Sequence, residues 1–425
     1  MFDIKLRVLI NYKVTTAEGS YILKYYKNPE ELELIQGEID SISAVQDKVE
    51  IDLPLQKSEL KVLSDGSFIR LSSFVEGKFL YEVPHTSRLL VNLGQKMAAL
   101  NTAQSSLKNS AIKARKSEWD LQHTLLNESK LRFIENPFDR NIVSYFMDRH
   151  HMQVSPIQDS LRSQVIHGDL NENNILVDEN SLTGLIDFGD ICHSPLINEV
   201  AIALTYIILL NPDNWMESAS SVLRGYVGEN ALRRQEIELL YQLIASRLCI
   251  SVLNSAEAKA ENGATEYILQ NEKPAWKTLK TWIRTNPILV KNTFLKVCGF
   301  SIENPDSETQ LAKRKQVASD SLSLSYSEPI HMASAAFQYM FDTSGNTYLD
   351  AYNNIPHVGH CHPEIAKVIS KKARTLNTNT RYLYNEYTSY SEKLLAKFPE
   401  QLNKVLLVNS GSAASDLAIR MAKTI

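Results

Sequence analysis

The residue types with the clearest chemical meaning lie in one stretch, VIHGDLNENNILVDENSLTGLIDFGD, at residues 165–190. Asp169 precedes the amide Asn174 by five positions, and a second carboxylate, Asp187, follows a predicted strand pair. Phosphoryl transfer from a nucleotide needs Mg²⁺ on the phosphates and a carboxylate that orients the attacking hydroxyl and accepts its proton. Asp169 suits the second task, and the oxygens of Asn174 and Asp187 suit the metal. The spacing therefore predicts a magnesium-dependent phosphoryl-transfer site.

Upstream residues predict where a nucleotide would bind. Two strands, 6–14 and 19–26, should form a hairpin around the turn TTAEG. Lys24 lies on the second strand, where it could pair with the α- and β-phosphates of the nucleotide. A carboxylate on the following helix is expected to hold this lysine, and both Glu33 and Glu38 lie near the required place.

A further strand is predicted from Phe68 to Val75, and Ser72 to Gly77 should form a hinge behind it. The backbone of this hinge, including Phe74 and Val75, is expected to meet the nucleotide base. Because backbone contacts leave no side-chain signature, ATP and GTP both remain possible donors.

Two lobes must position these residues. After Thr86 the apolar residues recur at helical spacing, whereas the residues before it form a β-rich pattern with one helix. Short strands are expected at Val165–Ile166, Ile175–Val177 and Leu185–Ile186. Helices are expected at 139–149, 197–210, 216–225, 231–260 and 264–283. The sequence predicts an α+β fold with a small lobe and hinge over 1–77 and a helical lobe over 78–300.

The rest of the chain differs in composition. Serine and charged residues make up half of 301–330, which is typical of an interdomain linker. A new globular pattern covers 331–425, and within it an apolar strand, Val405–Val408, should lead into Asn409-Ser410-Gly411-Ser412 and a helix. Free N–H groups at that helix start would suit a phosphate, and a plain serine cap is the alternative. His357, His360, Cys361 and His362 cluster, but zinc ligands usually come from two separate segments.

Overall composition excludes several other classes of protein. The 425 residues carry 45 Lys and Arg against 49 Asp and Glu, a net charge of −4, which gives no reason to expect nucleic acid as a partner. The longest apolar stretch, Val200 to Leu210, is shorter than the ~20 residues of a membrane span and favours a buried helix. Four dispersed cysteines indicate a reducing compartment. We therefore expect a cytoplasmic protein without a membrane partner.

The motif HGDLNENN, the segments NYKV and YILK, Glu118-Trp119-Asp120-Leu121, and HSPLINEVAIALTY resemble the aminoglycoside phosphotransferase-like kinase superfamily over residues 5–300. The hydroxylysine kinase branch is the most similar. The resemblance implies a bilobal protein-kinase-like fold and phosphorylation of a hydroxyl on a small amine-bearing molecule. It gives Asp169 the role of base and makes Asn174 and Asp187 metal ligands. The chain starts just before the hairpin, which puts the strength of nucleotide binding in question.

A second resemblance covers about 322–425. The series MFDTSGNTYLD, NNIPHVGHCHP, LNTNTRYLY and NSGSAASDLAIRMA looks like the N-terminal part of class III pyridoxal-phosphate-dependent aminotransferases. The ethanolamine-phosphate and phosphohydroxylysine phospho-lyase branch is closest. It implies a partial α/β domain of fold type I in which Gly411 and Ser412 contact the cofactor phosphate. The Schiff-base lysine comes later in such enzymes, so this truncated segment should be inactive alone, and a homodimer would need the complete domain.

The order of the two segments indicates a substrate. A kinase followed by a lyase that eliminates phosphate suggests an amino alcohol or hydroxy-amino acid, such as ethanolamine or 5-hydroxylysine. Two alternatives remain: a fragment of an aminotransferase with an accessory kinase part, or a pseudokinase that only binds small molecules.

Overall fold

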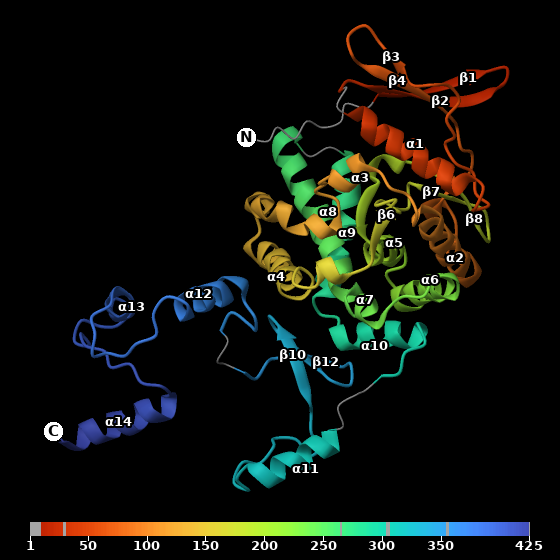
Figure 1. The fold of residues 1–425 in the computed structure, drawn as a ribbon. Coiled ribbons are helices and arrows are strands. Elements are labelled where there is room, and N and C mark those ends of the chain that lie inside the picture. The colour runs from red at the N-terminus through yellow and green to blue at the C-terminus, as the bar shows by residue number, and fades with distance from the viewer. Residues whose placement is uncertain (1–9, 29–30, 264–265, 303–306, 354–356, 425) are drawn as a thin grey trace. The chain divides into compact units, whose positions relative to one another are not determined.

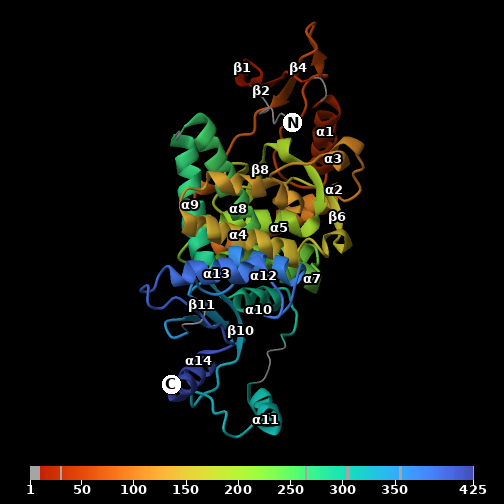
Figure 2. The same cartoon turned by 90° about the vertical axis from the view of Figure 1, so that its left-hand side faces the viewer.

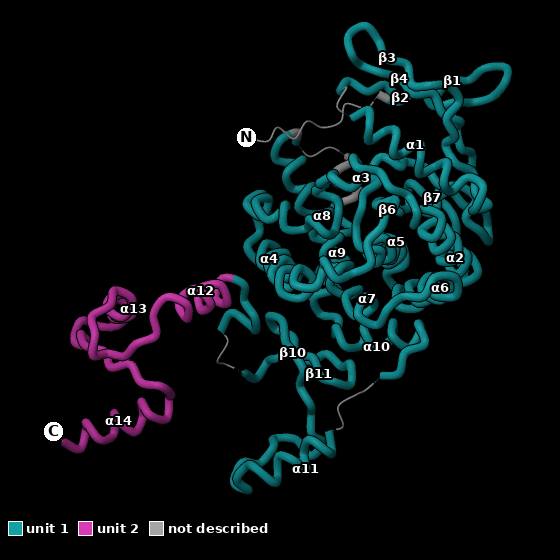
Figure 3. The backbone as a smooth tube through the Cα atoms, in the orientation of Figure 1, with its two compact units in different colours: residues 1–363 teal, residues 364–425 magenta. Residues whose placement is uncertain are grey.

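The computed structural model divides the chain into two compact units, residues 1–363 and 364–425 (Figure 3). In unit 1 a small β-rich lobe precedes a larger helical lobe (Figure 1). This confirms the expected α+β two-lobed fold. The residues that the structure describes are 10–28, 31–263, 266–302, 307–353 and 357–424.

The small lobe is built on a four-stranded antiparallel sheet in the order β1-β2-β4-β3. Its strands are β1 (Ile10–Thr16), β2 (Gly19–Tyr26), β3 (Lys61–Val62) and β4 (Phe68–Ser73). The hairpin of β1 and β2 is the predicted one, although the start of its first strand, residues 6–9, lies outside the described residues. The register of the sheet places Lys24 on β2 opposite Arg70 on β4. This pairing places two cationic side chains near each other, and both line one cavity.

One helix, α1 (Leu32–Gln46), covers this sheet. Its Ile35 packs with Tyr26 and Phe68, whose rings stack at 4.9 Å. The residue before α1, Glu31, caps it without a side-chain hydrogen bond.

Two small sheets frame the loops predicted to carry the chemistry. β5 (Lys78–Phe79), β7 (Ile175–Val177) and β8 (Leu182–Leu185) form one sheet, and β6 (Ser163–Ile166) pairs with β9 (Cys192–Pro195) in the other. The last predicted strand is shifted, because Ile186 leaves β8 and donates its N–H to the carbonyl of Asn174. That bond ties the two loops together at the strand ends.

The helical lobe packs around α5, whose residues are almost all buried. Its helices are α2 (Ser87–Gln104), α3 (Ser110–Ala114), α4 (Pro137–Gln153), α5 (Leu196–Leu210), α6 (Trp215–Glu229), α7 (Arg234–Glu238), α8 (Leu240–Asn262), α9 (Glu266–Trp282) and α10 (Pro287–Val297). The 3₁₀ segments are η2 (Leu80–Glu82), η3 (Leu121–Phe133), η4 (Gln158–Ser160) and η5 (Phe188–Asp190). The single helix expected over 231–260 is two, α7 and α8, and the start of the helix expected at 264 lies outside the described residues. Among the described helices none has the length and apolar character to cross a bilayer.

The contact between α2 and α6 depends on two glycines. A Cβ on Gly94 of α2 would lie 2.0 Å from the carbonyl oxygen of Val222, and one on Gly225 of α6 would lie 1.9 Å from that of Val91. Any larger side chain would push the two backbones apart, so these positions require glycine.

A buried histidine in this lobe predicts how stability responds to pH. His150 of α4 is buried against the hydroxyl of Ser246, and burial lowers its pKa to about 4. The unfolded chain would bind this proton near pH 6.5. As pH falls from 6.5 to 4 the unfolded state gains the proton first, so the folded state should lose up to about 3 kcal/mol.

Denaturant unfolding of wild type and His150→Gln at pH 7.5 and pH 5 measures this effect. The wild type should lose more stability between the two pH values than the variant does. Equal losses would show that His150 does not titrate in this window.

The segment expected to begin the second domain packs on the helical lobe. β10 (Met332–Ala336), β11 (Tyr339–Asp342) and β12 (Thr347–Leu349) form an antiparallel meander beside α10 (Figure 2). Asn286 donates to the carbonyls of Asp342 and Asn346, and Phe337 lies 5.7 Å from the ring of Tyr145. Apolar residues of the meander therefore belong to the core of the lobe, and the boundary between the two compact units follows Pro363.

Truncating Phe337 tests this packing. Phe337→Ala removes a buried ring from the core and should lower the free energy of unfolding of the helical lobe by about 3–5 kcal/mol. Leu349→Ala on the exposed part of β12 is the matched control and should change it by less than about 0.5 kcal/mol. An unchanged unfolding midpoint in Phe337→Ala would show that the meander does not stabilise the helical lobe.

The predicted linker contains one helix, α11 (Ser307–Val317), which has no buried residue. Its Glu, Gln, Ala, Lys and Arg residues all favour helix without a core. Residues 303–306 of this linker lie outside the described residues.

The described residues of unit 2 form helices joined by irregular segments. α13 (Asn385–Leu395) and α14 (Gly411–Thr424) follow α12 (Pro363–Ala373). The strand predicted at Val405–Val408 is wrong, since these residues belong to no strand of the structure. A strand needs a neighbour for its ladder, and no described segment supplies one here.

Candidate active site

The loop from His167 to Asn174 joins β6 to β7 and is held by hydrogen bonds to the buried carboxylate of Glu199. Glu199 of α5 accepts hydrogen bonds from the backbone N–H of His167 and of Gly168, both at 2.9 Å. The ring of His167 bonds the carbonyl of Ile186 at 3.1 Å and lies 4.6 Å from Phe188. The histidine of the motif is therefore a structural link between the two loops.

Close backbone contact fixes the second loop. Gly168 has φ +80°, and a Cβ there would lie 2.5 Å from the carbonyl oxygen of Asp190. Arg115 donates to the carbonyls of Gly189 and Ile191 at 2.8 Å and to the carboxylate of Asp190 at 3.1 Å. A residue larger than glycine would separate the loops, because the contact is with backbone.

Asp169 lies at the end of this platform with both carboxylate oxygens engaged. Its Oδ2 accepts from the amides of Asn171 at 2.7 Å and Asn174 at 2.9 Å, and its Oδ1 accepts from Arg247 at 2.6 Å. Burial raises the pKa of Asp169 to about 6, and the guanidinium of Arg247 opposes that rise. At neutral pH the group is therefore an ionised carboxylate with a basicity suited to accepting a proton.

Asn174 and Asp187 could hold a divalent cation. The amide nitrogen of Asn174 donates to Asp169 at two points, which leaves its oxygen for a metal. Asp187 lines the same cavity as Asn174, and its carboxylate is 57% exposed. An amide oxygen and a carboxylate facing one cavity are hard ligands that fit Mg²⁺.

The predicted nucleotide residues meet in that cavity. It encloses about 200 Å³ and brings Lys24, Phe74 and Val75 together with Asn174 and Asp187. Lys24 Nζ lies 3.7 Å from Asp187 Oδ1. The residues proposed from three separate stretches of sequence therefore line a single cleft between the lobes.

The acid expected to hold Lys24 has a different partner. Glu38 is buried and lies 3.2 Å from Arg70, whereas Glu33 is exposed. Lys24 instead pairs with Asp187. Arg70 and Glu38 both line the cleft, so a buried ion pair forms part of its wall.

Sequence reasoning missed three charged residues of this site: Arg70, Glu199 and Arg247. Each is buried, and each bonds a residue that is distant in the sequence. Arg247 gave a usable signal, because it is the one charge in the apolar run LIASRLCISVL. A charge in such a run predicts a buried partner, although not its identity.

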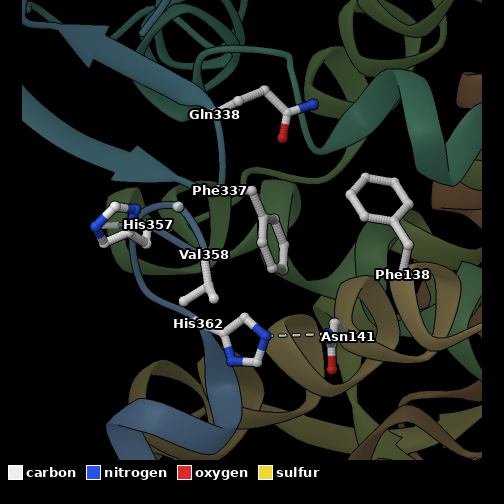
Figure 4. Close-up of a pocket in the computed structure, with 8 residues that line it drawn as sticks. Phe138, Asn141, Phe337, Gln338, His357, Val358 and His362 are labelled. Carbon is white, nitrogen blue, oxygen red and sulfur yellow. Dashed lines mark hydrogen bonds between the residues drawn. The ribbon is translucent and has the colours of Figure 1, made fainter. Parts of the chain in front are cut away.

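A second, larger cavity of about 410 Å³ lies between α4 and the meander (Figure 4). Phe138, Phe337 and Val358 give it apolar walls, and Asn141 bonds His362 at 3.1 Å. It shares no lining residue with the nucleotide cleft and contains no carboxylate. It does not gather the groups that phosphoryl transfer requires.

The residues singled out in the C-terminal segment do not form a built site. A Cβ on Gly411 would meet no atom within 4 Å, and Ser410 Oγ already caps the N–H of Ala413. Gly411 and Ser412 are exposed, so no cradle for a cofactor phosphate surrounds them. Within the described part of the chain, no three His, Cys, Asp or Glu side chains converge as a metal site, those at 357–362 included.

Comparison with known families divides the chain in the same two parts. The family described as "Phosphotransferase enzyme family" matches residues 9–235, and the family described as "Aminotransferase class-III" matches residues 325–425. Among solved structures, amicoumacin kinase hAmiN in complex with AMP-PNP, Ca2+ and Ami aligns at TM-score 0.50 and 18% identity over 66% of this chain and 87% of that one. The microcompartment-associated aminopropanol kinase aligns at TM-score 0.50 and 18% identity over 70% of this chain and 92% of that one. These alignments show a kinase-like fold.

Curated relatives match a little more than a quarter of this chain. "Alanine--glyoxylate aminotransferase 2-like" of Drosophila melanogaster is 42% identical over 119 residues, which are 28% of this chain and 24% of the relative. "Ethanolamine-phosphate phospho-lyase homolog 1" of Caenorhabditis elegans is 38% identical over 117 residues, 27% of this chain and 25% of the relative. The chain spans about a quarter of the length of these relatives.

Proposed function

The chain belongs to the phosphotransferase enzyme family, and on that premise we propose that it transfers the γ-phosphate of ATP or GTP to the hydroxyl of an amino alcohol or hydroxy-amino acid. One observation carries the proposal. A single cleft is lined by Lys24, Asn174 and Asp187, and the amide of Asn174 bonds Asp169 directly. This arrangement supports roles for Asp169 as the base, for Asn174 and Asp187 as metal ligands, and for Lys24 as the cation that binds phosphate.

The roles of these residues follow from their charges. Lys24 offers an ammonium group to the α- and β-phosphates, and Phe74 and Val75 line the side of the cleft formed by the hinge. Asn174 and Asp187 would hold Mg²⁺, which neutralises phosphate charge when bound. These groups provide positioning and electrostatic stabilisation, which supply most of the catalysis in phosphoryl transfer.

Asp169 acts on the acceptor. Its carboxylate accepts the hydrogen bond of the substrate hydroxyl and then the proton as the oxygen attacks the γ-phosphorus. A bond forms between the acceptor oxygen and phosphorus, the bond from phosphorus to the β–γ bridging oxygen breaks, and that oxygen leaves with the electron pair as a nucleoside diphosphate. The proton on Asp169 returns to solvent after product release.

The acceptor class is inferred from the neighbouring segment. Residues 325–425 match the class III aminotransferase family, and one relative of this chain bears the name ethanolamine-phosphate phospho-lyase homolog. A lyase of that name consumes a phosphorylated amino alcohol. Phosphorylation converts a hydroxyl into a good leaving group, which a following elimination requires. A covalent link between two such modules would raise the local concentration of the intermediate.

A panel of acceptors tests the proposal. Purified full-length chain with Mg²⁺ and ATP or GTP is incubated with ethanolamine, 5-hydroxylysine and kanamycin, and phosphorylated product is measured by mass spectrometry. Product with an amino alcohol or hydroxy-amino acid supports the proposal. Product with kanamycin alone would overturn the acceptor class, and no turnover with any acceptor would favour a binding role.

The segment 331–425 is proposed to have no transaminase or lyase turnover by itself. Exposure of Gly411 and Ser412 without a surrounding cradle supports this. Addition of pyridoxal phosphate should produce no visible absorption band of a bound aldimine, and a saturable band would contradict it.

A further inference from the structure

Arg247 is the buried charge closest to the reacting group. Its side chain is 2% exposed, and its Nη2 lies 2.6 Å from Asp169 Oδ1. The guanidinium contacts two rings, with its carbon 4.9 Å from the centroid of Trp119 and 5.4 Å from that of Tyr206. This arginine thus reaches the catalytic loop from α8, far away in the sequence.

Further bonds lock the guanidinium in place. Nη1 donates to the carbonyl of Trp119 at 3.0 Å, and Nε and Nη2 donate to the hydroxyl of Tyr206 at 3.2 and 2.9 Å. Burying a cation costs free energy unless it is paired and hydrogen-bonded. Here the pairing carboxylate is Asp169, so the charge of Arg247 is balanced by the proposed base itself.

The two carboxylate oxygens of Asp169 accept different numbers of hydrogen bonds from side chains. Oδ2 accepts from two amides, of Asn171 and Asn174, while the side-chain donor on Oδ1 is Arg247. A carboxylate oxygen can accept two hydrogen bonds, so Oδ1 retains capacity for one more. That capacity suits the hydroxyl of an acceptor.

We propose that Arg247 is a positioning residue that holds the carboxylate of Asp169 in the orientation that receives the acceptor hydroxyl. The inference rests on the proposed kinase function. The guanidinium fork contacts Asp169 and Tyr206 at once, and the rings of Trp119 and Tyr206 keep it from turning. A lysine ammonium at this position would retain the charge without the planar fork.

The proposal also gives a role to the motif Glu118-Trp119-Asp120-Leu121. Trp119 supplies both a ring and a carbonyl to Arg247, and Asp120 anchors the segment by accepting from Ser194 of β9 at 2.7 Å. The motif therefore supports the catalytic loop through Arg247.

Steady-state kinetics of variants test this role. Arg247→Ala should lower kcat about 100-fold, the size of effect expected when a catalytic group is misplaced by about 1 Å, with KM for the nucleotide within about 2-fold of wild type. Millimolar guanidinium ion should restore part of the activity of Arg247→Ala, and Arg247→Lys should fall between the two. Arg224→Ala, which removes an exposed arginine of α6, is the control and should match wild type.

The outcomes separate the two proposals. A wild type without turnover on any acceptor defeats the kinase function, whereas an active wild type with unchanged kcat in Arg247→Ala defeats only the positioning role. Loss of activity without rescue by guanidinium or lysine, together with a lowered melting temperature, would make Arg247 structural. If Arg247→Ala does not fold, Tyr206→Phe provides the test. This variant removes the two hydrogen bonds from the guanidinium to the hydroxyl of Tyr206 and should lower kcat several-fold. An unchanged kcat would overturn the proposal.

Discussion

Replacing Asp169 with asparagine is expected to lower kcat by about 10²- to 10⁴-fold, the contribution typical of a general base. Asparagine has the same shape and can still accept from Arg247, but it cannot take the proton of the acceptor hydroxyl. Nucleotide binding should persist, because Asp169 does not line the nucleotide cleft. Mg²⁺-dependent formation of phosphorylated product measures the loss.

Asp159→Asn provides the control for that experiment. Asp159 is an exposed aspartate of η4, so its charge is lost without a change to the site. This variant should turn over like wild type. Equal rates for wild type and Asp169→Asn would show that Asp169 has no catalytic role. A thermal shift with nucleotide and Mg²⁺ would show whether the Asp169→Asn variant is folded.

The proximity of Asp169 and Asn174 could be predicted from sequence because the two residues lie in one short loop. Asp169 and Asn174 are five residues apart, and a short loop between two strands can only place them close together. Asp187 follows the next strand, and the pairing of β7 with β8 returns it to the same edge. The three residues therefore converge by strand geometry alone.

The wall of the cleft could not be predicted in the same way. The choice between Glu33 and Glu38 depended on which strand faces α1, and the pairing of β2 with β4 puts Arg70 opposite Lys24. Arg70 then binds Glu38, and Lys24 is left to pair with Asp187. Such choices depend on long-range register, which the spacing of residues within one element does not encode.

The packing of the meander could not be predicted for a related reason. The carboxylate of Asp342 organises a hairpin turn by accepting from the backbone N–H of Ser344 and of Asn346. Its neighbour Phe341 is buried in the kinase-like lobe. Composition identified the polar linker, whereas the docking of the meander arises from packing, which the composition of 331–349 does not reveal.

Replacing Asp187 with asparagine should weaken the binding of Mg²⁺ and lower turnover. Asp187 has φ +58°, a left-handed conformation that asparagine tolerates, so the backbone of the loop should be retained. The variant loses the carboxylate proposed to hold Mg²⁺ and the charge that faces Lys24. A bound cation stabilises the transition state by several kcal/mol, so kcat/KM should fall about 100-fold or more.

A Mg²⁺ titration distinguishes this effect from a general loss of activity. In Asp187→Asn the Mg²⁺ concentration for half-maximal turnover should rise, and the thermal shift produced by nucleotide with Mg²⁺ should shrink, while the melting temperature without ligands stays near that of wild type. Asp178→Asn, in the exposed turn between β7 and β8, is the matched control and should show the wild-type Mg²⁺ curve. An unchanged curve in Asp187→Asn would mean that the cation is held elsewhere, and Asn174 would then lose its proposed role as well, because an amide oxygen alone is too weak a ligand to retain Mg²⁺.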